Sequence, residues 1–107
     1  MNSVMKEIIS REPDLAVEVG PYLDHLSQVE CRVIDQSYLD FLDEQILLAA
    51  RGDEWSNVLD KRRKALSEHV GVELLSASLE ARGYAYFIRV NPVTRKVVYW
   101  ERHEISQ

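Results

Sequence analysis

The sequence predicts an α+β fold in which a helical hairpin packs on a small antiparallel sheet. Apolar residues recur with a helical period from about residue 37 to 51 and again from about 54 to 70. In the C-terminal third the period shortens to two, which predicts a β-hairpin with strands at about 84–91 and 96–102. Gly52-Asp53 separates the two helical stretches and predicts the bend between them.

The first predicted helix has an apolar face and an acidic face. Ser37 is the expected N-cap, with Asp40 three positions further on, as in a capping box. The face that we expect to be buried carries Tyr38, Phe41, Leu42, Ile46 and Ala49. The opposite face carries Asp40, Asp43, Glu44 and Leu47.

The second predicted helix opens at Asp53 and ends near Gly71. Its apolar stripe consists of Trp55, Val58, Leu59, Leu66 and Val70. Arg62 points along the side of that stripe, so we expect its methylene stem to cover apolar surface.

The rest of the chain gives weaker signals. Residues 3–9 predict a short helix, and residues 29–34 predict a strand. Residues 13–20 fit a strand or a short helix begun at Pro13. Residues 72–81 are open between a helix and a strand, and the four-residue spacing of Leu75 and Leu79 favours the helix.

Size and composition indicate one soluble domain spanning residues 1–107. The chain has 107 residues and is 46% hydrophobic, which is typical of a globular domain. No apolar run is long enough to cross a bilayer, and the acidic N-terminal stretch does not match a signal peptide. We therefore expect a cytoplasmic protein. The one cysteine, Cys31, lies between two valines in an alternating stretch and is expected to be buried and inert.

Charge is divided unevenly along the chain. Residues 1–60 hold 13 acidic and 4 basic residues, whereas residues 61–107 hold 5 acidic and 9 basic residues, and the whole chain carries a net charge of −5. An acidic surface repels nucleic acid and attracts basic proteins.

Residues with catalytic or metal-binding patterns are missing from the sequence. The three histidines, His25, His69 and His103, have no metal-ligand spacing, and no glycine-rich phosphate loop or nucleophile elbow occurs. We therefore expect no enzyme activity, no catalytic residues, no metal and no cofactor.

Residues 66–102 resemble a winged-helix layout, with the C-terminal β-hairpin as the wing. The resemblance implies a DNA-binding regulator that uses Arg95, Lys96 and the basic run at residues 61–64. The segment that would enter the groove instead carries Glu73 and Glu80, where phosphate contact requires Lys or Arg.

The sequence thus favours a small acidic protein-binding module, for example an inhibitor of the immunity-protein or antitoxin type, that docks a basic protein partner. DNA binding through the winged-helix-like layout and a role as an accessory subunit of a larger complex are the alternatives. The candidate partner-binding residues are Asp40, Asp43, Glu44, Leu47, Asp53 and Glu54.

Overall fold

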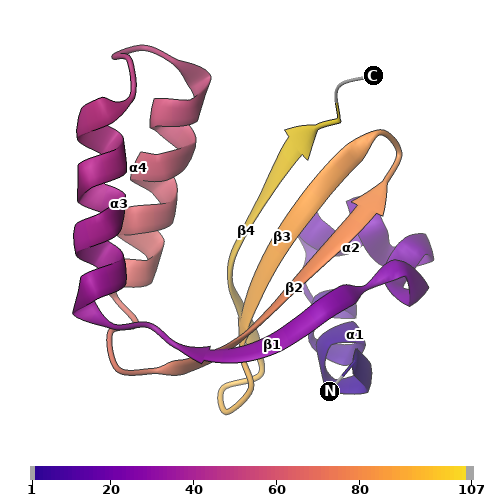
Figure 1. The fold of residues 1–107 in the computed structure, drawn as a ribbon. Helices are drawn as coiled ribbons and strands as arrows, with labels where there is room; N and C mark the ends of the chain where they lie inside the picture. Colours follow the sequence, from indigo (N-terminus) through magenta and orange to yellow (C-terminus); the bar gives the residue numbers. More distant parts are fainter. Residues whose placement is uncertain (1, 106–107) are drawn as a thin grey trace. The chain divides into compact units, whose positions relative to one another are not determined.

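The structure, a computed structural model, describes residues 2–105 and confirms the α+β fold class. Within these residues the chain forms four α-helices, one 3₁₀ helix and a four-stranded antiparallel sheet (Figure 1). The helices are α1 (Asn2–Ser10), α2 (Pro13–Val19), η1 (Gly20–His25), α3 (Gln36–Leu48) and α4 (Glu54–Ser67). The strands are β1 (Ser27–Val33), β2 (Glu73–Ala81), β3 (Tyr84–Asn91) and β4 (Lys96–Glu104).

The chain divides into two compact units. Unit 1 comprises residues 1–32 and 73–107, which contain the sheet and the N-terminal helices. Unit 2 comprises residues 33–72 and contains the α3–α4 hairpin. Whether the two units fold cooperatively, as the expected single domain would, stays a prediction.

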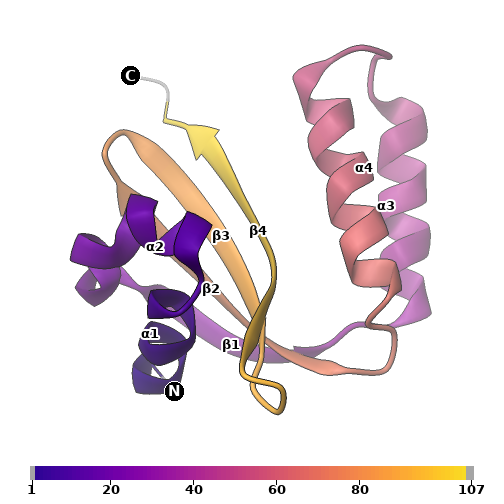
Figure 2. The same cartoon turned by 180° about the vertical axis from the view of Figure 1, so that it is seen from behind.

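In unit 1 the strands follow one another in the order β1-β2-β3-β4, and the N-terminal helices cover one face of the sheet (Figure 2). Met5, Ile8 and Ile9 of α1 and Leu15 and Val19 of α2 are fully or almost fully buried. Their partners in the sheet are Leu75, Ala77, Leu79, Ala81, Tyr86, Ile88 and Val90. The predicted N-terminal helix is confirmed, and Pro13 begins a helix, not a strand.

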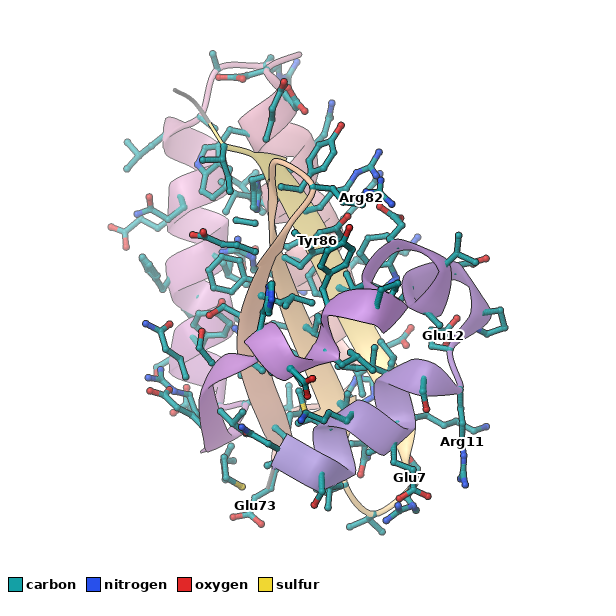
Figure 3. All side chains as sticks on the ribbon, turned by 90° about the vertical axis from the view of Figure 1, so that its right-hand side faces the viewer. Glu7, Arg11, Glu12, Glu73, Arg82 and Tyr86 are labelled. Atoms are coloured by element: carbon teal, nitrogen blue, oxygen red, sulfur yellow. The ribbon has the colours of Figure 1, made fainter. Side chains whose placement is uncertain are left out.

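One hydrogen-bonded cluster ties this N-terminal layer to the sheet. The hydroxyl of Tyr86, a fully buried side chain that lies beside the N-terminal helices in Figure 3, donates to Glu18 on α2 at 2.9 Å. Arg102 on β4 donates to the same carboxylate and lies over the ring of Tyr84, 4.6 Å from its centroid. Two strand side chains, Tyr86 and Arg102, therefore hold α2 through Glu18.

The favoured helix at residues 72–81 is wrong, because this segment is strand β2. Every second residue from Leu75 to Ala81 is buried in the core, which is the period of a strand. Arg82 and Gly83, with φ of 54° and 83°, form the tight turn into β3. Gly83 therefore closes a β-hairpin, and the winged-helix-like layout loses the helix it requires.

The predicted C-terminal β-hairpin is confirmed as β3 and β4. The predicted strand at 29–34 is confirmed as β1, but the expectation that Cys31 is buried is wrong. Cys31 is exposed because β1 is at the edge of the sheet, where alternation alone does not bury a side chain.

Candidate functional site

The candidate site lies on unit 2, whose two helices run antiparallel and contact each other along the hairpin. Aspartates start both helices. Asp35, not Ser37, is the N-cap of α3: its carboxylate accepts from the backbone N–H of Tyr38 at 2.9 Å and from the hydroxyl of Ser37 at 2.7 Å. These bonds lower the pKa of Asp35, the Ser37 hydroxyl contributing most. Asp53 caps α4 as predicted and accepts from the N–H of Trp55.

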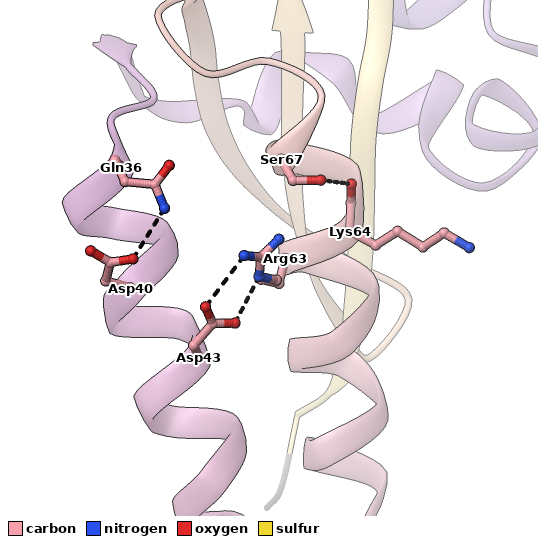
Figure 4. Close-up of polar contacts among 6 residues, drawn as sticks. All are labelled: Gln36, Asp40, Asp43, Arg63, Lys64 and Ser67. Atoms are coloured by element: carbon pink, nitrogen blue, oxygen red, sulfur yellow. Dashed lines mark hydrogen bonds and ion pairs between the residues drawn. The ribbon is translucent and has the colours of Figure 1, made fainter.

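A two-pronged ion pair joins the helices. The Nε and Nη2 of Arg63 donate to the two carboxylate oxygens of Asp43 at 2.7 and 3.3 Å (Figure 4). Arg63 therefore lowers the pKa of Asp43, mainly through this hydrogen bonding, and the carboxylate in turn raises the pKa of the guanidinium. Asp40 accepts from the side-chain amide of Gln36 at 3.1 Å, one turn earlier (Figure 4). The carboxylate of Asp43 is therefore occupied by the ion pair that links α3 to α4.

The hydrophobic core of unit 2 is narrow. Its buried apolar residues are Ile34, Leu39, Leu42, Leu59 and Leu66. The predicted buried face of α3 is wrong in one respect, because Phe41 is 46% exposed and Leu39 is buried in its place. Trp55 and Val70, which were expected in the apolar stripe of α4, are also about half exposed. Arg62 lies with its guanidinium 5.5 Å from the centroid of the Trp55 ring, on the side where we expect it.

The free end of the hairpin exposes apolar side chains among carboxylates. Leu47 is 86% exposed and Leu48, its neighbour, is 76% exposed. We define the hairpin tip as Glu44, Leu47, Leu48, Asp53, Glu54 and Trp55. Of the predicted site residues, Glu44 and Leu47 lie in the last turns of α3, and Asp53 and Glu54 lie at the start of α4, while Asp40 and Asp43 make their own contacts along the helices.

Sequence reasoning missed Leu48 and Trp55 as exposed apolar residues. The bend begins earlier than Gly52, since α3 ends at Leu48 and Ala49 is already extended. Leu48 is therefore the last residue of the helix, where it is 76% exposed, whereas Leu42, earlier in the helix, is 1% exposed. The ion pair could have been found, because Asp43 and Arg63 are equally far along the chain from Asp53 and so face each other in an antiparallel hairpin.

Unit 1 carries a shallow hollow on the sheet face opposite the N-terminal helices. Polar side chains from β1 and β2 line it together with Phe87, which is 50% exposed. Glu30 and Arg32 are among its lining residues, and the Nε of Arg32 donates to the carboxylate of Glu30 at 2.7 Å. The remaining lining side chains include Gln28, Ser76, Ser78 and Arg89.

Comparison of the chain with protein-family models, with curated proteins and with solved structures gives no match. Among residues 2–105, no three histidine, cysteine or carboxylate side chains gather as a metal site would require. No helix in this part of the chain combines the length and the apolar character needed to cross a membrane.

The Asp43–Arg63 pair leads to a pH-dependent prediction. Replacing Asp43 with Asn is expected to lower the urea midpoint of unfolding at neutral pH, because Arg63 loses its partner. The pKa of Asp43 is lowered from its ordinary value of 3.8 in the folded protein, so the pair stabilises the fold fully above that value. This stabilisation disappears as the pH falls through the lowered pKa, and the two proteins should then have the same midpoint.

The measurement is urea unfolding of wild type and Asp43→Asn at a series of pH values from 7 to about 2, the range in which carboxylates titrate. Glu44→Gln, one residue away on the exposed side of α3, is the matched control and should leave the midpoint unchanged at every pH. A difference between wild type and Asp43→Asn that stays constant down to the lowest pH would contradict the assigned ion pair.

Proposed function

We propose that this protein is a binding module whose hairpin tip docks a basic protein partner. The proposal is supported chiefly by Leu47 and Leu48, two neighbouring leucines with 86% and 76% of their surface exposed. Burying one leucine side chain on a partner contributes about 1.5–3 kcal/mol, so two adjacent leucines supply a substantial part of a micromolar affinity. Exposed apolar residues clustered among charged residues are typical of protein contacts.

The charge of the same region supports a basic partner. From residue 43 to residue 55 the chain carries four carboxylates and a single guanidinium, that of Arg51. Asp43 is neutralised by Arg63, so Glu44, Asp53 and Glu54 together with Arg51 leave this stretch a net charge of −2. Carboxylates at the rim of an apolar contact accelerate association with a basic surface and discriminate against acidic ones.

A basic protein with an apolar patch inside its basic surface is therefore the partner that fits this site. Enzymes that act on nucleic acid have basic surfaces of this kind, and an inhibitor of such an enzyme is the role that we propose for the module. The sequence-based candidates Asp40 and Asp43 are assigned to the fold of the hairpin in this proposal, and Leu48 and Trp55 join the contact surface.

The test compares what the tagged protein captures from a nuclease-treated lysate of its source organism. Leu47→Ser/Leu48→Ser removes the apolar part of the tip. Val17→Ser/Val93→Ser is the matched control, because these two valines are 79% and 87% exposed and lie outside the hairpin. We expect a basic protein that wild type and control recover equally and that the tip variant recovers at least about tenfold less.

A second pair of variants tests the charges. Glu44→Gln/Glu54→Gln should slow association with the recovered protein and flatten its salt dependence, whereas Glu73→Gln/Glu104→Gln, in the sheet of unit 1, should change neither. If the tip variant captures the same proteins in the same amounts as wild type, the proposed function is wrong.

A further inference from the structure

The outer edge of β1 is an open strand edge. β1 is the first strand in the sheet order and has β2 as its only strand neighbour among residues 2–105 (Figure 1). Six of its seven residues are exposed, and it contains neither lysine nor proline, two residues that commonly protect strand edges. The edge at β4 differs, because a shift in register near Val90 marks a bulge there and Lys96 begins the strand.

Backbone hydrogen bonds just past β1 determine which of its residues face outward. The N–H of Ile34 donates to the carbonyl of Val72 at 3.2 Å, and the carbonyl of Ile34 accepts from the N–H of Gly71 at 2.7 Å. Ile34 therefore directs both groups toward the chain that leads into β2. In an antiparallel ladder such groups alternate in direction, so Cys31 directs its N–H and C=O away from β2. Gln28, whose φ is 54°, lies before this stretch and does not disturb the alternation.

The sequence along this edge is complementary to itself. Residues 29–33 read Val-Glu-Cys-Arg-Val. If two copies pair antiparallel with a two-fold axis at Cys31, the Glu30 of each copy lies opposite the Arg32 of the other, which gives two such pairs. This pairing also sets Val29 opposite Val33. Opposite charges and β-branched residues are favourable cross-strand pairs.

Charge also excludes the neighbouring registers. A two-fold axis shifted by one residue toward the N-terminus would place Glu30 opposite Glu30, and a shift toward the C-terminus would place Arg32 opposite Arg32. Like charges directly opposite one another destabilise a strand pair. In the register centred on Cys31 the two cysteines form a hydrogen-bonded pair, and each Glu30–Arg32 pair is of the closer, non-hydrogen-bonded kind.

We propose that the β1 edge pairs with the β1 edge of a second copy of this chain, in the antiparallel register centred on Cys31. The pairing continues the four-stranded sheet across the two-fold axis into one of eight strands. The contact between two short strands buries less than the roughly 800 Å² per partner of a stable complex, so the dimer forms in a concentration-dependent way. The β1 edge shares no residue with the hairpin tip, and the proposed pairing does not depend on the proposed function.

Charge reversal at the paired positions tests the register. Sedimentation of the full-length protein over a concentration series should show a monomer–dimer equilibrium for wild type. E30R and R32E should each dimerise about tenfold more weakly, because every opposite-charge pair becomes a like-charge pair. The double variant E30R/R32E should regain the wild-type equilibrium.

The decisive sample is the mixture of the two single variants. Glu30 and Arg32 also pair within one chain at 2.7 Å, and both single variants lose that contact. The mixture cannot restore the contact within a chain, but it places opposite charges across the two-fold axis. E30R and R32E each dimerise weakly when alone. When mixed, they should therefore form a mixed dimer with about the wild-type affinity.

A short bifunctional maleimide provides a second readout at Cys31, the exposed cysteine at the centre of the proposed register. It should link two wild-type chains, link the mixed single variants faster than either variant alone, and fail with C31S. Circular dichroism of every variant establishes that each one is folded. A wild type that stays monomeric at all concentrations, or single variants that dimerise as wild type does, would overturn the proposal, whichever result the tip variants give.

Discussion

Truncating Leu59 to Ala is expected to destabilise the hairpin by about 2–5 kcal/mol. Leu59 is 1% exposed, and it is one of only five fully buried apolar residues in unit 2. So small a core cannot easily fill the space that the truncation leaves. Leu48→Ala, at a site 76% exposed on the partner helix, is the matched control and should change the free energy of unfolding by less than about 0.5 kcal/mol.

The two tryptophans allow the same variant to test whether the chain is one cooperative domain. Trp55 belongs to the hairpin and Trp100 to β4, so Trp100→Phe and Trp55→Phe backgrounds report on unit 2 and unit 1 separately. If residues 1–107 unfold as one domain, Leu59→Ala shifts the urea midpoint equally in both backgrounds. A shift in the Trp55 signal alone would contradict the single-domain prediction.

Tyr86→Ala should lower the free energy of unfolding by about 3–5 kcal/mol, at least as much as Leu59→Ala does. The reason is that the aromatic ring is fully buried in the core of unit 1. Tyr86→Phe separates the ring from the hydroxyl. It removes the 2.9 Å hydrogen bond to Glu18 while Arg102 still holds that carboxylate, so we expect a smaller loss of about 1.5 kcal/mol.

The loss caused by Tyr86→Phe should depend on pH in a defined direction. Burial of the ring, and then its hydrogen bond to Glu18, raise the pKa of Tyr86 above its ordinary value of 10.0. The hydroxyl therefore stabilises the fold fully below pH 10.0, and this contribution disappears as the pH rises through the raised pKa. Urea unfolding at neutral and at alkaline pH should show the midpoint of wild type approaching that of Tyr86→Phe as the pH rises. A difference that widens at alkaline pH would contradict the bond.

The elements that could be predicted from sequence are those with a long, regular apolar period. The two helices of the hairpin and strands β3 and β4 belong to this group, and Asp53 marks the start of α4 correctly, whereas α3 ends four residues before Gly52. Strand β2 could not be identified, because Leu75 and Leu79 satisfy a period of four as well as a period of two. The alanines and serines between them are too small to decide between the two periods.

Burial was harder to predict than secondary structure. The apolar face of helix α3 is a broad arc with Leu39 and Phe41 at its two edges, so its period does not single out Leu39 over Phe41. Cys31 alternates with valines as a half-buried residue does, but alternation says only that two residues share a face. Whether that face is covered depends on the position of the strand in the sheet, and β1 is at the edge.

Only part of the candidate site could be predicted, because contacts between elements cannot be derived from the period of one element. Leu47 was expected to be exposed and is exposed, since it shares a face with carboxylates. Asp43 shares that face but reaches across to Arg63, a contact that depends on the pairing of two helices. A helical period places a side chain on one side of its own helix and does not specify which side chain of the neighbouring helix it meets.

Along the chain, the helical hairpin is inserted between β1 and β2, two strands that are neighbours in the sheet, and this affects the order of folding. Two neighbouring strands usually close over a few residues, but here about forty residues intervene, which raises the entropic cost of closure by roughly 2 kcal/mol over a tight turn. The helices reduce that cost once they form, because the Ile34–Val72 and Gly71–Ile34 hydrogen bonds bring the two ends of the insertion together. The β2–β3–β4 meander and the helical hairpin, both built from local contacts, should therefore form early, and β1 should join the sheet last.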